Sequence, residues 1–111
     1  MNLSELCESL SLKVINGDVD SVQWDGVYVG DLLSRAMSHV HESNLWITIM
    51  SNSNVIAVAS LTEAAAVILA EGVELLPDAM KAAVDNEVVI LSTTDSVYDL
   101  CQKIGETVKR A

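Results

Sequence analysis

Short apolar runs typical of buried strands alternate along the chain with segments of helical periodicity, and this alternation constrains the fold most. The expected strands span residues 12–15, 27–29, 45–49, 66–70 and 88–91, and the expected helices cover about 3–10, 32–40, 54–62, 77–84 and 97–108. A strand that is followed by a helix and a second strand forms a crossover, which makes the two strands parallel. The sequence therefore predicts an α/β fold with a small, mainly parallel sheet.

The chain is expected to form one domain over residues 1–111. This length suits a domain of common size, and no repeat, low-complexity tract or Pro/Gly-rich linker interrupts it. Apolar residues make up 50% of the sequence. A parallel sheet that is covered on both faces explains this fraction, and so does a surface that is buried against a partner or a second copy. The sequence leaves both explanations open.

Charge and targeting features argue against several classes of partner. The net charge is −10, and the six basic residues are scattered except for the last pair, so nucleic acid and anionic membranes are not expected to bind. The N-terminus lacks the basic start of a signal peptide. The uncharged stretch 43–62 has Ser51-Asn52-Ser53-Asn54 at its middle, which a bilayer centre does not tolerate. Cys7 and Cys101 are expected to be buried free thiols rather than a disulfide, which favours a cytoplasmic location.

Motifs that carry catalytic chemistry are missing. The sequence contains no GxxxxGK[ST] or GxGxxG phosphate loop, no GxSxG elbow and no HExxH. His39 and His41 stand two apart on an expected helix, so they point to different sides and are expected to be solvated. Asp18 and Asp20 suit a turn better than a cation site. We therefore expect no catalytic residue, no metal and no cofactor, and we expect that the protein is not an enzyme.

The carboxyl ends of the expected strands supply the candidate binding residues. Loops at these ends of parallel strands meet at one edge of a sheet, where ligands usually bind. The candidates are the small and polar residues of these loops: Gly30, Asp31, Ser51, Asn52, Asn54, Gly72, Ser92, Thr93 and Thr94. No Lys or Arg lies in the loops. The same residues serve as ordinary helix caps, with Asp31, the 51–54 segment, and Thr94 or Asp95 expected at helix N-termini. Plain caps therefore remain the alternative to a site.

From about Leu6 to Val108 the chain resembles the DRTGG domain family. The resemblance runs through 12–17, 27–34, 45–49, 54–59, 67–72 and 89–93. It implies a three-layer α/β/α fold similar to the N-terminal, non-catalytic domain of HPr kinase/phosphorylase. The namesake Asp-Arg pair would fall near Asn52 and Ser53, and the Thr-Gly-Gly near 70–72, where only Gly72 is kept. The chain looks like the short stand-alone members of anaerobic bacteria, which are often encoded beside iron-only hydrogenase subunits.

These observations predict a regulatory or sensing module. It would bind a small ligand at the C-terminal edge of the sheet, a protein partner, or both. The alternative is an assembly subunit that has no small-molecule ligand, and an enzyme of unknown reaction is a remote third reading. The expected partners are a second copy, giving a homodimer, and a redox or signalling protein, with no nucleic acid and no membrane.

Overall fold

In the computed structural model, which describes residues 1–110, five strands form one sheet in the order β1-β5-β4-β3-β2. The strands are β1 (Lys13–Asn16), β2 (Gly26–Val29), β3 (Asn44–Thr48), β4 (Ala66–Leu69) and β5 (Ile90–Ser92). Neighbours from β2 to β5 are parallel, whereas β1 pairs antiparallel with β5. The prediction of a mainly parallel sheet is confirmed, and the sheet is mixed because of β1.

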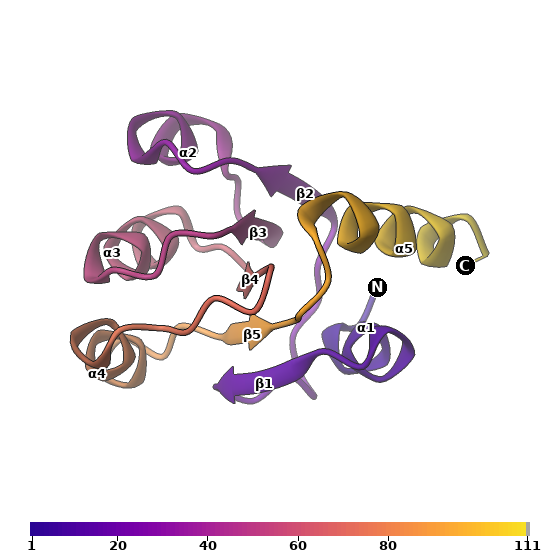
Figure 1. The fold of residues 1–111 in the computed structure, drawn as a ribbon, viewed down its shortest axis with the longest axis horizontal. Helices are drawn as coiled ribbons and strands as arrows, with labels where there is room; N and C mark the ends of the chain where they lie inside the picture. Colours follow the sequence, from indigo (N-terminus) through magenta and orange to yellow (C-terminus); the bar gives the residue numbers. More distant parts are fainter. Residues whose placement is uncertain (111) are drawn as a thin grey trace.

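Helices cover both faces of the sheet, as Figure 1 shows. On one face lie α1 (Leu3–Leu10) and α5 (Val97–Arg110), and on the other lie α2 (Leu33–His39), α3 (Ser53–Thr62) and α4 (Pro77–Asp85). The expected three-layer α/β/α arrangement is therefore confirmed. Pro77 is the first residue of α4, as predicted, because its fixed φ and missing N–H suit that position.

Two hydrophobic cores fill the space between these layers. Because side chains alternate along a strand, Leu45 and Ile47 pack with α1 and α5, whereas the Trp46 between them packs with α2, α3 and α4. All three side chains are fully buried. Trp46 also donates its indole N–H to the carbonyl of Gly30 over 2.9 Å. Full burial of each such side chain contributes about 1.5–3 kcal/mol to stability.

The connection from β1 to β2 has no helix and links the two opposite edges of the sheet (Figure 1). The N-terminal segment fixes its course, since the backbone N–H of Leu3 bonds to Val22 and that of Trp24 bonds to Met1. Trp24 is only 4% exposed. The polar stretch from Asp18 to Asp25, with Val22 and Trp24 interleaved, indicates an irregular connection, and the structure shows that it is anchored to the N-terminal segment.

Of three expected helix caps, two differ in the structure and one, that of α3, lies in the expected segment 51–54. Asp31 does not cap α2, because the N-cap position falls on Leu32 and has no side-chain hydrogen bond. The cap of α3 is Asn52, whose side-chain oxygen accepts the N–H of Asn54 over 3.0 Å. At α5 the hydroxyl of Ser96, rather than Thr94 or Asp95, accepts the N–H of Asp99 over 3.1 Å. The sequence preference for capping residues identifies the correct loop, but the residue that caps the helix can lie one or two positions away from the expected one.

The predicted apolar face of α2 is only partly correct. Ala36 and Val40 are buried, whereas Leu32 and Met37 are 59% and 51% exposed. This helix packs chiefly beside α3 and lies at the end of the sheet where β2 is the edge strand, so fewer of its apolar side chains are covered than the sequence pattern predicts.

Neither cysteine is in a disulfide. Cys7 lies in the core between α1 and α5, and Cys101 packs against the same core with partial exposure. Within residues 1–110, no helix combines the length and apolar character that crossing a membrane requires.

Candidate functional site

A cleft of about 490 Å³ lies at the carboxyl ends of β4 and β5. One wall is the loop that leads from β4 to α4, and the other is the segment that follows β5. The start of β1 closes the third side, because the antiparallel pairing sets Lys13 opposite Ser92 at the end of β5. The cleft therefore sits at the edge where ligands bind in open α/β sheets.

The lining of the cleft is mixed in character. Polar groups come from Ser11, Lys13, Glu74, Ser92, Thr93 and Thr94. Apolar side chains come from Ile15, Leu69, Val73, Leu75 and Met80. A lining of this kind suits a small molecule that has an apolar body and a few polar groups, and the volume is in the usual range for such sites, roughly 300–1,000 Å³.

Backbone hydrogen bonds join the two walls of the cleft. The N–H of Gly72 bonds to the carbonyl of Thr93 over 3.0 Å, and that of Glu71 bonds to Asp95 over 2.8 Å. Gly72 has φ of +71°, a conformation that glycine adopts without strain. These bonds fix the loops relative to each other, so the mouth of the cleft is formed without a ligand.

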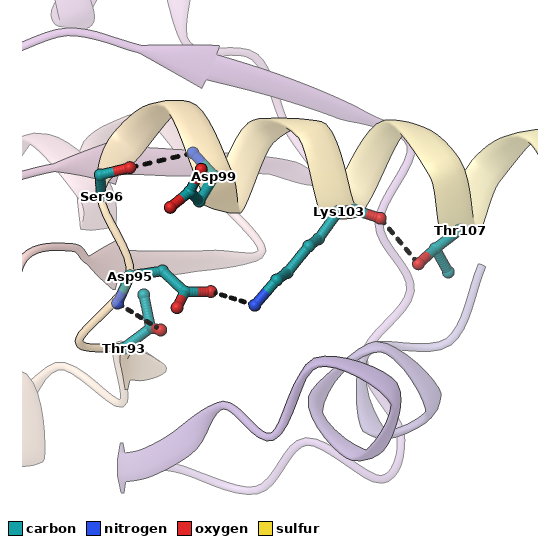
Figure 2. A network of polar contacts seen from close by, with 6 residues as sticks. All are labelled: Thr93, Asp95, Ser96, Asp99, Lys103 and Thr107. Atoms are coloured by element: carbon teal, nitrogen blue, oxygen red, sulfur yellow. Dashed lines mark hydrogen bonds and ion pairs between the residues drawn. The ribbon is translucent and has the colours of Figure 1, made fainter.

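A polar network continues from the cleft into α5 (Figure 2). The hydroxyl of Thr93 accepts the N–H of Asp95 over 3.1 Å. The carboxylate of Asp95 forms an ion pair with Lys103, whose Nζ lies 2.7 Å from Oδ2. The hydrogen bond to Asp95 and its charge raise the pKa of Lys103. The negative charge of Asp95 is therefore compensated beside the cleft.

The structure brings together only part of the predicted site. Gly72, Ser92, Thr93 and Thr94 line the cleft.

The remaining candidates, Gly30, Asp31, Ser51, Asn52 and Asn54, lie after β2 and β3 and make contacts within the fold. Gly30 accepts the bond from Trp46, and Asp31 accepts bonds from Thr48 and Ile49. The carbonyl of Ser51 accepts the N–H of Leu76, and Asn52 caps α3. None of these five residues lines the cleft at the ends of β4 and β5.

Lys13 is the one cation on the lining of the cleft, and sequence reasoning missed it, as it missed the polar residues Ser11 and Glu74. We expected no cation at this edge because no Lys or Arg lies in the loops after the strands. This expectation considered only the loops that follow strands ending at this edge of the sheet, whereas β1 begins at this edge. The available signal was the missing helix between residues 16 and 26, since without a crossover helix nothing sets β1 parallel to its neighbour.

Other chemically active side chains do not converge in the described part of the chain. Within it, no three His, Cys, Asp or Glu residues group closely enough to hold a metal ion. Ser38 Oγ lies 2.9 Å from His39 Nδ1, but both side chains are exposed on α2 and lie outside the cleft. Burial raises the pKa of both thiols, so thiolate is disfavoured.

A second hollow, of about 400 Å³, lies between α5 and the open edge strand β2. We call it the edge groove, and its lining includes Trp24, Val27, Cys101, Gly105 and Val108. The indole N–H of Trp24 is buried and finds no acceptor among the residues described. Most of the lining is apolar, and Asp25 is its one charged residue.

These features define a small three-layer α/β domain with a preformed cleft at the carboxyl edge of a mixed sheet. The sequence profile described as the DRTGG domain matches residues 5–107. The chain therefore belongs to the DRTGG domain family, as its resemblance to that family predicted. No relative was found among curated protein sequences.

A solved structure has the same fold. It is the crystal structure of the CBS and DRTGG domains of the regulatory region of Clostridium perfringens pyrophosphatase, complexed with its activator diadenosine tetraphosphate. The TM-score is 0.72 at 14% sequence identity, and the match covers 93% of this chain and 45% of the other. This chain thus spans less than half of the length of that regulatory region.

Proposed function

We propose that this protein is a non-catalytic regulatory module that binds a small ligand in the cleft at the carboxyl ends of β4 and β5. The observation that carries the proposal is the cleft itself, which is preformed, of ligand size and lined by Gly72, Ser92, Thr93 and Thr94. The structural relative supports a regulatory role, because its title describes a regulatory region in complex with a nucleotide activator. Binding would be reported to a partner protein.

The test is a thermal-unfolding screen of the purified protein. The panel contains nucleotides, including diadenosine tetraphosphate, as well as nicotinamide cofactors, acyl phosphates and divalent metal ions. A ligand at a hundredfold excess over its dissociation constant adds about 2.7 kcal/mol to the free energy of unfolding, which raises the Tm of a domain of this size by several degrees. A selective shift that is lost on Thr94→Trp, which fills the cleft without adding a charge, supports the proposal. A panel without any shift contradicts it.

The edge groove favours a second candidate function, that of an assembly subunit. The strand β2 is at the edge of the sheet, and Val27 and Val29 on it are 42% and 44% exposed. An open edge strand beside an apolar groove is a surface on which a further chain can pair. The expected occupants are a second copy, giving a homodimer, and a redox or signalling protein.

Sedimentation equilibrium separates the two occupants. A homodimer that uses the edge groove dissociates on Val27→Lys, whereas Val84→Lys on the exposed surface of α4 leaves it intact. A monomer at all concentrations removes the homodimer and leaves a different protein as the partner. The link to iron-only hydrogenase remains a prediction of the family resemblance. A cytoplasmic location belongs to the same proposal and is favoured by the two free thiols.

A further inference from the structure

We infer that the ligand of the cleft is a small organic phosphate and that Lys13 binds its phosphate group. The inference rests on the proposed function, since it names the chemistry of the ligand for the same site. It begins from the direction of β1, which is the one strand that starts at this edge of the sheet. The antiparallel pairing places Lys13 on the lining of this cleft, to which no other Lys or Arg contributes.

The charge of Lys13 is available to a ligand. Its side chain is exposed, and the single ion pair found among the side chains described, those of residues 1–109, joins Lys103 to Asp95. That pair also compensates the carboxylate that follows Thr94, so it weakens the repulsion that an incoming anion would meet. The remaining acid on the lining is Glu74, on the opposite loop.

Hydroxyl groups around Lys13 complete the environment that a phosphate needs. Ser92 is the register partner of Lys13, and Ser11, Thr93 and Thr94 line the same cleft. The hydroxyl of Thr93 already accepts a bond from the N–H of Asp95, which leaves its hydrogen to donate elsewhere. A phosphate carries three terminal oxygens that accept such donors, and a lysine binds it as a point charge, whereas a planar carboxylate is better matched by an arginine.

The rest of the cleft indicates an organic body rather than a free phosphate ion. The volume of about 490 Å³ far exceeds what one phosphate fills, and Ile15, Leu75 and Met80 supply an apolar wall. The carboxylate of Glu74 accepts hydrogen bonds only, so it suits hydroxyl groups on the ligand. A phosphate, hydroxyl groups and a planar or apolar body together describe a molecule of mononucleotide size.

The experiment is calorimetric titration of the purified chain with three organic phosphates and their phosphate-free counterparts. The pairs are adenosine 5′-monophosphate with adenosine, ribose 5-phosphate with ribose, and acetyl phosphate with acetate, and inorganic phosphate is titrated alone. The expected result is that at least one organic phosphate binds ten times more tightly than its counterpart and than inorganic phosphate. Lys13→Met then lowers its affinity by about tenfold or more, while the matched variant Lys81→Met, on the exposed surface of α4, stays within twofold.

Each other outcome overturns the inference. If an organic phosphate binds the Lys13→Met variant as tightly as it binds the natural protein, this lysine does not hold its phosphate group. Equal affinity for each phosphate and its counterpart, or no binding tighter than about 1 mM, excludes phosphate recognition. In these cases the screen of the proposed function still decides separately. If an uncharged ligand binds and its binding is lost on Thr94→Trp, the regulatory module is retained. If no ligand binds at all, both proposals are removed. Because Lys13 is exposed, the unliganded Tm of Lys13→Met checks that the variant folds.

Discussion

The carboxylate of Asp31, in the turn after β2, accepts two hydrogen bonds from the end of β3, one from the hydroxyl of Thr48 over 2.7 Å and one from the N–H of Ile49 over 3.0 Å. Thr48 is 1% exposed, and its oxygen in turn accepts the N–H of Met50. The residue that we expected to cap α2 therefore joins the ends of two neighbouring strands.

Replacing Asp31 with Ala should lower the free energy of unfolding by about 1–2 kcal/mol, because a buried hydroxyl loses its acceptor. Thr48→Val removes the same bond from the other side, so the double variant should lose less than the sum of the two single losses. Urea unfolding of the four proteins measures the coupling energy, which we expect to be about 0.5 kcal/mol or more. Losses that add without any coupling would show that the two side chains do not act as a pair.

The N-cap of α3 gives a second prediction. Asn52→Ala should destabilise the protein by about 1 kcal/mol, because the N–H of Asn54 loses its side-chain acceptor. Asn54→Ala is the matched control, since this exposed residue contributes only its backbone to the cap. Its effect should stay within about 0.5 kcal/mol in thermal or urea unfolding. A larger loss at Asn54 than at Asn52 would contradict the assignment of the cap.

The layers of the fold could be predicted from the sequence because periodicity reports burial directly. A run such as Val67–Leu69 is apolar on both sides of the pleat and is covered on both faces, as a central parallel strand requires. The direction of β1 could not be predicted in this way. It is set by its pairing with β5, over 70 residues away in the chain, and no local pattern encodes such a pairing.

Only some of the candidate site residues lie in the cleft, because their positions at strand ends could be predicted but the contacts of their polar side chains could not. Gly72, Thr93 and Thr94 follow central parallel strands, so the rule for strand ends places them in the cleft. Asp31 and Asn52 also follow parallel strands, but their polar side chains are used by nearby backbone and hydroxyl groups. Residue type alone does not separate a polar group that is used within the fold from one that is available to a ligand.

Gly105 gives a third prediction, in which one substitution should change the stability of the fold and its association with a second chain in opposite directions. A β-carbon added at this position meets nothing within 4 Å, so the fold has no need of glycine there. Gly105→Ala should stabilise α5 by up to about 1 kcal/mol, because alanine loses less backbone entropy in a helix. Gly17→Ala is the contrast: with φ of +97° and a β-carbon 2.9 Å from the side chain of Val89, it should destabilise the protein.

The same two variants test the edge groove, since Gly105 lines it and Gly17 does not. If a second chain packs closely in this groove, the methyl group of Gly105→Ala weakens the association while the Tm of the isolated protein rises. An association that is unchanged in Gly105→Ala would place the contact elsewhere on the molecule.

The two thiols give the last prediction. Burial raises the pKa of Cys7 and Cys101 above the ordinary value of 9.0, because the thiolate is poorly solvated inside the fold. Well below pH 9 both the folded and the unfolded chain keep these protons, so there neither thiol makes stability depend on pH. Above it the unfolded chain loses them first, and the free energy of unfolding falls as the pH rises.

Urea unfolding at pH 8 and pH 10 measures this loss of stability. For each protein, the free energy of unfolding at pH 10 is compared with its own value at pH 8, and the difference should be smaller in Cys7→Ala than in the natural protein.

Reaction with a disulfide reagent at pH 7.5 gives an independent readout of the burial of the two thiols. Cys7, which is 7% exposed, should react more slowly than the partly exposed Cys101, and both should react fast in urea. The variants Cys7→Ser and Cys101→Ser assign each rate to one thiol. Reaction of native Cys7 at the rate seen in urea would mean that the contact between α1 and α5 opens readily, and it would contradict the burial on which the pH argument rests.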